Sequence, residues 1–484
     1  MLFMGIDVGT TGVRTLVCNE KGEIIAESDV KLKNAVCLNL PPGYSEQIPE
    51  KWWIAVKESI VEVTGKMHGK GYSPHDILAI ACDSTSGTVI PIDKEGKPLY
   101  NALMYNDARA IHQANIINDI ARDFTEKIGH RFKPSDALCK ILWIKQNLPS
   151  IYKKTYKFIH AADFITGKLT ENFSVSDESN SLKTGYDLID RKWPEFIEKK
   201  LKISPELLPG VVPSGQAIGE VTPSTARELG LVAGISVRAG VTDGTASFIS
   251  SGAYREGDWN STLGTTLVVK GISKRLIKDP LGRIYCHRHP DGYWLPGGAS
   301  SSGGECLEKI FKDKDLEKLN LMVPEYTPTP MFVYPLVRKG ERLPFVNPEA
   351  KGFVVGKARD EYELYTAYLE GVAYVEKWIY EVISQLGAEI GNRIYTSGGG
   401  NKSKPWLQIR ADVLQKILVK TNFTSAALGC AILAASRTFY TSLMEAAKNM
   451  IGEKEEIHPR LKYADLYGQR YDHFRKLCRE RGYE

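Results

Sequence analysis

The chain has 484 residues, of which 43% are hydrophobic, so it is long enough for about two or three domains with large cores. Its net charge is only +5 and its basic residues are scattered, which argues against a nucleic-acid or membrane-surface partner. Eight irregularly spaced cysteines without a C-x-x-C pair favour reduced thiols. We find no signal-peptide pattern and no apolar run near the ~20 residues of a membrane span, and expect a cytoplasmic monomer or homodimer.

The N-terminal residues predict three strands joined by tight turns. Residues 2–9 are apolar and extended, residues 10–19 continue after a Gly-Thr-Thr turn, and residues 20–30 form a third strand. This pattern differs from a P-loop or a dinucleotide-binding fingerprint, because both place a helix N-terminus directly after their glycines. Residues 49–67 then predict an amphipathic helix that begins at a proline.

The first turn has the composition of a phosphate site. Glycine allows a tight turn, so that backbone N–H groups and threonine hydroxyls of Gly9, Thr10 and Thr11 can converge on phosphate oxygens. An ordinary hairpin turn is the alternative explanation. Asp7 lies beside this turn, where a carboxylate can accompany phosphates only if a cation stands between them.

A second set of similar elements begins near the middle of the chain. Residues 235–253 predict a strand that runs into a helix, and residues 257–273 predict another strand–turn–strand unit, with Gly264, Thr265 and Thr266 at its turn. The repeated Gly-Thr-Thr hairpin indicates two related domains. We expect the change of domain near residues 236–243, which gives domains 1–240 and 241–484.

Two carboxylates, Asp7 and Asp243, follow apolar strands beside small-residue turns. Phosphoryl transfer to an alcohol needs backbone donors for the phosphates, a divalent cation and a carboxylate that accepts the hydroxyl proton. Asp7 suits Mg²⁺ bound through water, since this ion keeps most of its waters. Asp243 suits the base, although a helix N-cap is a common alternative role for an aspartate at such a position.

Other glycines and histidines give weaker signals. Residues 396–406 place three consecutive glycines after a strand, which lets the backbone approach a flat ligand such as adenine or simply makes a flexible turn. Gly298, in the segment 295–307, is a similar candidate for the nucleotide. His287 and His289 form an H-x-H pair without a third ligand cluster, so we expect surface or packing roles rather than a zinc site.

Taken together, these segments resemble the FGGY carbohydrate kinases. The resemblance implies an α/β fold of two ribonuclease-H-like domains of the actin and hexokinase superfamily, with mixed five-stranded sheets flanked by helices and an active-site cleft between the domains. It also implies ATP as the phosphate donor, with Gly399, Gly400 and Asn401 nearest the adenosine and Asp243 as the base. The segments that carry the resemblance are "GIDVGTTGVRTLV", "STLGTTLVV", "GVTDGTASFISSGA", "TSGGGNKSKPWLQIRADVL", "EQIPEKWW" and "AADFITGKLT".

Within that family, "ACDSTSGTVIPIDKEGKPL", "YNDARA", "LCKILWI" and "SDESNSLKTGYD" look like the ribulokinase-like branch. That resemblance implies phosphorylation of D-ribulose to D-ribulose 5-phosphate, with Asp7, Ser86 and Asp243 contacting the sugar. The branch more often has glycine where this chain has Ser84. Xylulokinases typically show Gln-Met-His-Gly in this loop, whereas this chain has Ser-Thr-Ser-Gly.

Three alternatives remain open at this stage. A kinase for D-xylulose, L-ribulose or another polyol would keep the same machinery and change only the pocket. An actin- or chaperone-like ATPase would use the nucleotide hairpins without phosphorylating a sugar. A sugar sensor that has lost catalysis is the third, although both carboxylates are retained.

Overall fold

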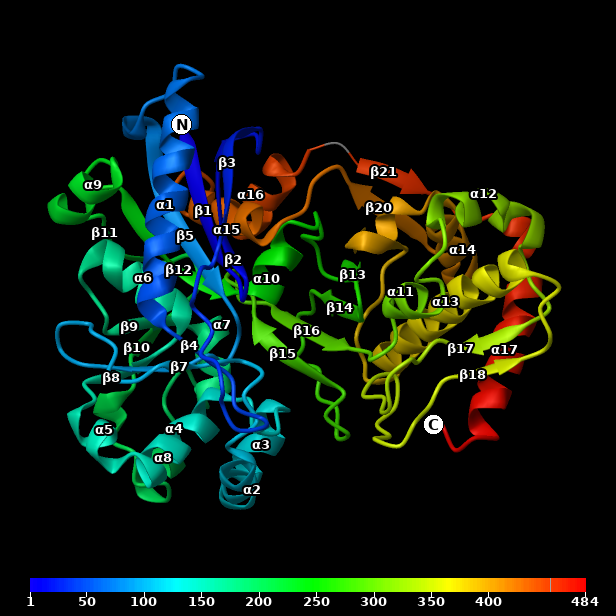
Figure 1. The fold of residues 1–484 in the computed structure, drawn as a ribbon, viewed down its shortest axis with the longest axis horizontal. Helices are drawn as coiled ribbons and strands as arrows, with labels where there is room; N and C mark the ends of the chain where they lie inside the picture. Colours follow the sequence, from blue (N-terminus) through cyan, green and yellow to red (C-terminus); the bar gives the residue numbers. More distant parts are fainter. Residues whose placement is uncertain (453) are drawn as a thin grey trace. The chain divides into compact units, whose positions relative to one another are not determined.

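The computed structural model describes residues 1–452 and 454–484. The chain divides into two compact units, and Figure 1 labels their elements. Unit 1 comprises Met1–Gly252, His287–Gly292 and Phe423–Gly452. Unit 2 comprises Ala253–Cys286, Tyr293–Asn422 and the described residues from Lys454 onward. Among the described residues, no helix combines the length and the apolar character needed to cross a bilayer.

Unit 1 is built on a mixed sheet of six strands in its described residues, in the order β11-β12-β5-β1-β2-β3. The first three strands form the expected antiparallel meander, while β5 and β12 run parallel to β1. The edge strand β11 is antiparallel to β12. The strands are β1 (Leu2–Val8), β2 (Gly12–Asn19), β3 (Ile24–Lys31), β5 (Ile77–Ser84), β11 (Ala217–Glu220) and β12 (Ser236–Thr242).

Unit 2 contains a mixed sheet of seven strands over its described part, in the order β15-β16-β14-β13-β19-β20-β21. Its central strands β16-β14-β13-β19-β20 repeat the directions of β3-β2-β1-β5-β12: an antiparallel meander beside two parallel strands. The strands are β13 (Trp259–Leu263), β14 (Leu267–Gly271), β15 (Ile284–Arg288), β16 (Trp294–Ala299), β19 (Arg393–Ser397), β20 (Ile417–Thr421) and β21 (Lys454–Ile457).

The prediction of two α/β units with mixed sheets is confirmed, but the sheets are wider than the five strands expected. The five central strands form the common core. One edge strand, β11, extends the sheet of unit 1, and β15 and β21 extend that of unit 2. Short edge strands of this kind carry few apolar residues, as Ala217–Glu220 and Lys454–Ile457 illustrate, so the hydrophobic pattern does not reveal them.

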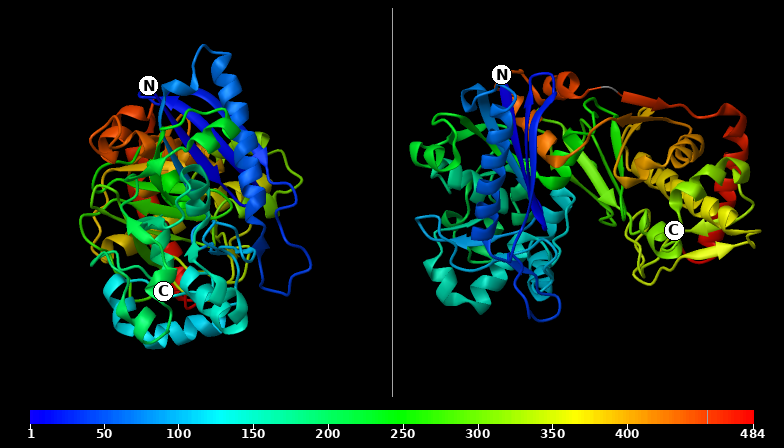
Figure 2. Two further views of the ribbon diagram at one scale, coloured as in Figure 1. Left: turned by 90° about the vertical axis from the view of Figure 1, so that its left-hand side faces the viewer. Right: turned by 45° about the horizontal axis from the view of Figure 1, so that its top comes forward.

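Helices cover both faces of the unit 1 sheet. On one face, alternate residues of β1, including Met4 and Ile6, form a buried cluster with Trp52 of α1 (Pro49–His68) and Phe164 of α6 (Ala161–Thr170). On the other face lies α15 (Ala426–Ala435), and Figure 2 shows α1 and α15 on opposite sides of the sheet. The period-two pattern of the strand therefore separates an apolar face from the face that carries Gly5 and Asp7.

The helix α15 packs at backbone distance, because most of its residues are small. A Cβ atom added to Gly5 would collide with the Ala427 carbonyl oxygen, and one added to Gly429 would collide with the carbonyl of Ala246 on α10 (Asp243–Ile249). This packing explains why residues after Phe423 return to unit 1. The expected domains 1–240 and 241–484 do not include this return of the chain to unit 1. The first segment of unit 1 also continues beyond residue 240, to Gly252.

The remaining elements of unit 1 surround its central sheet. Three small two-stranded sheets pair β4 with β7, β6 with β8 and β9 with β10. The elements are β4 (Glu46–Gln47), η1 (Pro74–Asp76), β6 (Ile90–Ile92), β7 (Ala102–Leu103), α2 (Ile111–Ile120), α3 (Arg122–Ile128), α4 (Ala137–Asn147), α5 (Pro149–Lys154), β8 (Lys157–Ile159), β9 (Val175–Asp177), α7 (Glu178–Ser181), η2 (Leu182–Thr184), α8 (Glu195–Lys199), η3 (Pro205–Leu207), β10 (Gly210–Val212), α9 (Pro223–Leu229) and α16 (Leu443–Met450).

The helices of unit 2 pack around its own sheet, and α13 alone spans 25 residues. A two-stranded sheet pairs β17 with β18. The elements are α11 (Glu305–Ile310), α12 (Leu316–Tyr326), β17 (Phe332–Tyr334), β18 (Phe353–Val355), α13 (Glu361–Gln385), η4 (Gly399–Lys402), α14 (Lys404–Leu414), η5 (Leu461–Tyr463) and α17 (Ala464–Arg479).

We predict that Gly5→Ala destabilises the protein, because the added methyl group has to push α15 away from β1. Overpacking of this kind costs about 1–3 kcal/mol. Gly65→Ala is the matched control, since Gly65 lies inside α1 with open space around it, and it should stabilise by about 0.5–1 kcal/mol. Urea unfolding of the variants measures both effects. Equal unfolding midpoints for the two variants would contradict the close packing of α15.

Candidate active site

The carboxyl ends of three parallel strands carry the predicted sugar-side residues. Asp7 lies near the end of β1, opposite Asp83 on β5, and Thr242 at the end of β12 lies opposite Ser84. Asp243 follows directly as the first residue of α10. The ends of neighbouring parallel strands form one edge of a sheet, which is the usual position of ligand sites in α/β folds. The structure therefore brings Asp7 and Asp243 together within unit 1.

A row of charged side chains crosses the sheet at the level of Asp7. The register pairs Asp7 with Arg14 of β2, and Arg14 in turn with Asp29 of β3. Arg14 makes an ion pair of 2.6 Å with Asp29, and its positive charge also favours the ionised form of Asp7. Cross-strand partners lie on the same face of a sheet, so these groups interact directly.

Asp83 is the part of the site that our sequence reasoning missed. Its side chain is fully buried, and the Sγ of Cys430 donates to its Oδ2 at 3.0 Å. Burial raises the pKa of Asp83 well above its usual value, and the charge of Asp7 raises it further. Among the described residues its Oδ1 meets no donor, which suits a protonated oxygen that donates instead. The side chains of Asp83 and Asp7 interact, and the pKa of Asp83 is raised more strongly, so Asp83 is the more readily protonated of the two.

The pKa of Asp7 is raised as well. Burial raises it most, the hydrogen bond with Asp83 lowers it, and the charge of Asp243 raises it again. Asp7 and Asp243 are both half-buried, so a ligand can reach them, whereas Asp83 cannot be reached. A bound cation would reduce the electrostatic repulsion between the carboxylates of Asp7 and Asp243.

The structure places Asp243 beyond the N-cap position. Thr242 is the N-cap of α10, and Asp243 is the first helical residue, with its Oδ1 accepting from Gly244 N at 2.6 Å. The alternative role of Asp243 as the N-cap is therefore wrong. Ser86 follows β5, and its Oγ is buried without a hydrogen-bond partner in the described structure. An unsatisfied hydroxyl just beyond a strand end is suited to a polar ligand.

The first Gly-Thr-Thr turn connects β1 and β2 as predicted. Gly9 N donates to Gly12 O at 3.0 Å, which closes the turn. Gln47 Nε2 donates to Thr10 O at 2.9 Å, and Leu32 N donates to Thr11 O at 2.9 Å. The carbonyl oxygens of Thr10 and Thr11 are thus already hydrogen-bonded to protein donors. A carbonyl oxygen that pointed toward a phosphate would repel it.

The second Gly-Thr-Thr turn connects β13 and β14 in unit 2. Gly264 N donates to Thr266 O at 3.1 Å, and Gly304 N donates to Gly264 O at 2.8 Å. A side chain at Gly303 would meet the backbone of Thr266 at 2.6 Å. Gly303 and Gly304 thus pack directly against the turn. Gly298, by contrast, pairs with Val269 inside the sheet, where an added Cβ atom would lie 2.6 Å from Arg283 O.

One buried carboxylate, Glu341, organises the loop that supports this second turn. Its Oε2 accepts from the hydroxyls of Ser300, Ser302 and Tyr334, each at 3.0 Å, and its Oε1 accepts from Ser301 N at 2.6 Å. Ser302 O then accepts from the first residue after the turn, Leu267 N, at 2.9 Å. No motif pointed to Glu341, because its partners are distant in sequence.

The predicted adenosine turn lies against the same strand. Gly398 and Gly400 approach Leu263 so closely that a Cβ atom at either position would overlap it, while Gly399 faces open space. Asn401 does not point freely toward a ligand: its Oδ1 accepts from Thr396 Oγ1 at 2.8 Å, and its Nδ2 donates to Thr396 O at 2.7 Å. The turn that includes Gly399 and the turn at Gly264 therefore meet at the end of β13.

The network behind Asn401 is also buried and ionic. Arg410 donates to Thr396 Oγ1 at 2.9 Å and to both carboxylate oxygens of Glu376, and neither charged side chain is exposed. A bidentate pair fixes the guanidinium plane. The predicted sugar-side residues thus lie in unit 1. The predicted nucleotide-side residues, apart from those of the first turn, lie in unit 2.

The predicted H-x-H pair does not belong to these groups. His289 accepts from Asp291 N at 3.1 Å, and burial lowers the pKa of His289 to about 4. In the part of the chain that the structure describes, no cluster of three or more His, Cys, Asp or Glu side chains could hold a metal ion.

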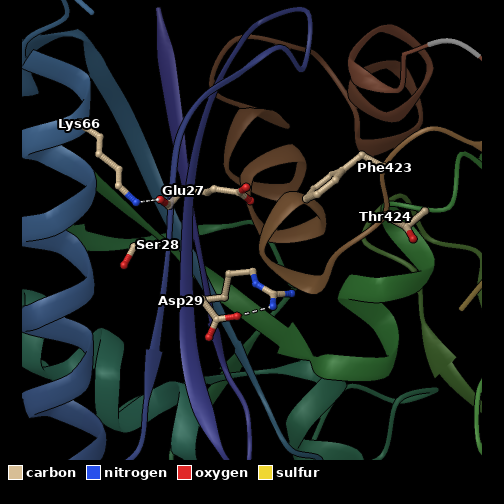
Figure 3. Close-up of a pocket in the computed structure, with 7 residues that line it drawn as sticks. Glu27, Ser28, Asp29, Lys66, Phe423 and Thr424 are labelled. Carbon is tan, nitrogen blue, oxygen red and sulfur yellow. Dashed lines mark hydrogen bonds and ion pairs between the residues drawn. The ribbon is translucent and has the colours of Figure 1, made fainter. Parts of the chain in front are cut away.

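A surface hollow of about 420 Å³ opens beside β3 and α1 (Figure 3). Arg14 and Asp29 on its wall bind each other, and Lys66 Nζ donates to Glu27 O at 2.8 Å. The charges of Arg14, Asp29 and Lys66 are thus engaged by protein groups, and no predicted site residue lines the hollow. Its lining is Arg14, Glu27, Ser28, Asp29, Lys66, Phe423 and Thr424.

We predict that Asp83→Asn makes the protein less sensitive to rising pH. A carboxyl with a raised pKa in the folded chain stabilises the fold below its unfolded pKa, and that contribution is lost as the pH rises through the folded pKa. Asparagine mimics the neutral acid and cannot ionise. Between pH 5 and pH 8, the thermal unfolding midpoint of the wild type should fall relative to that of the variant. Parallel curves for the two proteins would rule out a protonated Asp83.

The chain is similar to known proteins over nearly its whole length. Residues 2–250 match the N-terminal domain and residues 260–437 match the C-terminal domain of the FGGY family of carbohydrate kinases. A xylulose kinase of Bacillus subtilis (strain 168) is 25% identical, with 98% of this chain and 96% of that protein aligned. A gluconokinase of the same strain is 26% identical over 93% and 90%.

A solved structure shares this fold over nearly the full length of both chains. A crystal structure of a xyloylose kinase from Brucella ovis matches with a TM-score of 0.89 at 23% identity, covering 99% of this chain and 98% of that one. This likeness concerns the fold, while the two domain matches establish the family. The protein therefore belongs to the FGGY family of carbohydrate kinases and is an ATP-dependent phosphotransferase that acts on a small-molecule sugar.

Proposed function

We propose that the protein transfers the γ-phosphate of ATP to the terminal hydroxyl of a ketopentose, with D-ribulose as the first candidate. The observation that carries the proposal is the grouping of Asp7, Asp243 and the unsatisfied Ser86 hydroxyl around the strand ends of unit 1. The Ser-Thr-Ser-Gly loop supports ribulose, because xylulokinases typically have Gln-Met-His-Gly there.

In this proposal Asp243 accepts the proton of the terminal sugar hydroxyl. The hydroxyl oxygen forms a bond to the γ-phosphorus while the bond to the bridging oxygen of ADP breaks, and ADP leaves with that electron pair. Asp7 and Ser86 hold the sugar in position. The turns at Gly9–Thr11 and Gly264–Thr266 donate to the phosphates, and Gly298, Gly399, Gly400 and Asn401 are assigned to the nucleotide side, with Asn401 shaping its turn.

The residues present fit a hydrated Mg²⁺ at Asp7. This carboxylate is half-buried and next to a second one, and no cage of further ligands surrounds it in the described residues. Such a site suits an ion that keeps most of its waters and binds mainly to phosphates. When bound, the ion would neutralise phosphate charge.

The second candidate substrate is D-xylulose, because similar proteins of nearly the same length are xylulose kinases. ADP release measured with D-ribulose, D-xylulose, L-ribulose and D-gluconate separates the candidates, and NMR of the product identifies the phosphorylated carbon. We expect the highest kcat/KM with D-ribulose and phosphate on its terminal carbon. A higher kcat/KM with D-xylulose would overturn the ribulose assignment.

We predict that Asp243→Asn lowers kcat by about 10²–10⁴-fold, since the amide cannot accept the hydroxyl proton. The KM values should change little, because the two side chains have almost the same shape. Asp190→Asn, at an exposed ion pair of unit 1, is the matched control and should retain wild-type kcat. Near-normal sugar phosphorylation by Asp243→Asn would show that Asp243 is not the base.

We predict that Glu341→Gln raises the KM for ATP by about tenfold, because loss of a charged acceptor loosens the loop beneath the Gly264 turn. The KM for the sugar should stay unchanged, since no sugar-side residue belongs to this network. Glu349→Gln removes an exposed carboxylate from the same unit and serves as the control. An unchanged KM for ATP in Glu341→Gln would show that this loop does not affect nucleotide binding.

A further inference from the structure

A short buried segment, residues 177–184, has no role in the function proposed above although its sequence is unusually polar. It contains α7 (Glu178–Ser181) and η2 (Leu182–Thr184) and follows directly after β9. Its serines Ser179 and Ser181 are completely buried. Buried hydroxyls have to be hydrogen-bonded to be tolerated, so their partners show what this segment holds in place.

Ser179 bonds to the chain just before the proposed base. Thr242 N donates to Ser179 Oγ at 3.2 Å, and the hydroxyls of Ser179 and Thr242 are 3.1 Å apart. Ser179 also donates to Thr245 Oγ1 at 3.4 Å, and the Thr242 and Thr245 hydroxyls lie 3.0 Å apart. The Thr242 side chain does not cap α10. Ser179 therefore fixes the backbone from which Asp243 projects.

The helix that carries Ser179 is itself anchored. Asp177 Oδ1 accepts from Asn180 N at 2.8 Å, and Asp177 Oδ2 accepts from Asn180 Nδ2 at 2.7 Å. Residues 175–177 also pair with β10 as a parallel strand. Because α7 has only four residues, these bonds replace the stability that a longer helix would gain from its own turns.

The same segment reaches the loop that contains Ser86. Lys183 Nζ donates to Ser86 O at 3.3 Å. The Lys183 stem lies against Gly87, where an added Cβ atom would be 3.0 Å from Lys183 Cδ. One stretch of chain thus contacts both the backbone before Asp243 and the loop of the proposed sugar contact, from two points four residues apart in sequence.

We infer that Ser179 and Lys183 are positioning residues of the phosphorylation reaction: Ser179 sets the direction of Asp243, and Lys183 sets the Ser86 loop. The inference rests on the proposed function, because it takes Asp243 as the base and Ser86 as a sugar contact. A base displaced by about 1 Å can cost on the order of 10²-fold in rate, so a hydroxyl that touches no substrate can still control kcat.

The decisive experiment compares Ser179→Ala with Ser181→Ala in the full-length enzyme. Both remove one hydroxyl from a fully buried position on α7, but Ser181 bonds to Ser176 at 3.3 Å and not to α10. Ser179→Ala should lower kcat about tenfold, with KM values for sugar and ATP within about twofold of wild type. Ser181→Ala should retain wild-type kcat, and both variants should show similar thermal unfolding midpoints.

Two further variants extend the test. Thr242→Val removes the hydroxyl contact to Ser179 while keeping the backbone bond, so its kcat should lie between those of Ser179→Ala and the wild type. Lys183→Met keeps the stem against Gly87 but removes the ammonium, and it should raise the sugar KM on the order of fivefold while kcat is retained.

The outcomes separate the inference from the function on which it rests. Equal kcat in Ser179→Ala and Ser181→Ala, together with an inactive Asp243→Asn, would overturn the positioning role and leave the base in place. An active Asp243→Asn would overturn the base assignment and the inference with it. A kcat loss confined to Ser179→Ala and Thr242→Val, with folding intact, supports the inference.

Discussion

The backbone-distance packing of α15 is the constraint on which unit 1 depends. Gly5 and Gly429 let this helix lie directly on β1 and on α10, where any side chain would collide. The contact brings Cys430 onto Asp83 and holds one side of the helix that begins with Asp243. Ser179 holds the chain before the same helix. The proposed base is thus braced by two segments that come from different parts of the sequence.

This packing has an electrostatic consequence at the end of β1. Asp83 is fully buried, and Cys430 of α15 is one of its contacts, so water cannot stabilise its charge and burial raises its pKa. A neutral Asp83 can then donate to Asp7, which lowers the pKa of Asp7, although burial and the charge of Asp243 leave that pKa raised overall. Asp83 is therefore the more readily protonated of the two aspartates. The close packing that two glycines allow thus affects the ionisation of the site.

The sequence allowed the elements that carry local patterns to be predicted, but not those that depend on register. Both Gly-Thr-Thr hairpins, the strand before Asp243 and the amphipathic helix α1 are present as expected, since turn residues and apolar periodicity are local signals. Asp83 could not be assigned, because only the parallel register places it opposite Asp7. Nor could Glu341, whose partners lie up to 41 residues away, or the return of α15 to unit 1.

The two units use one strand arrangement with different chemistry at the same place. Counting back from the glycine of each turn, Asp7 in β1 corresponds to Thr262 in β13. Asp7 faces Asp83 on the neighbouring parallel strand, and Thr262 faces Ser397, with their hydroxyls 2.9 Å apart. Carboxylates in unit 1 can accept protons and attract a cation, whereas hydroxyls in unit 2 are neutral and do not repel phosphates. This difference agrees with the proposed activation of the sugar on unit 1, since at these matched strand positions the carboxylates belong to unit 1 and the hydroxyls to unit 2.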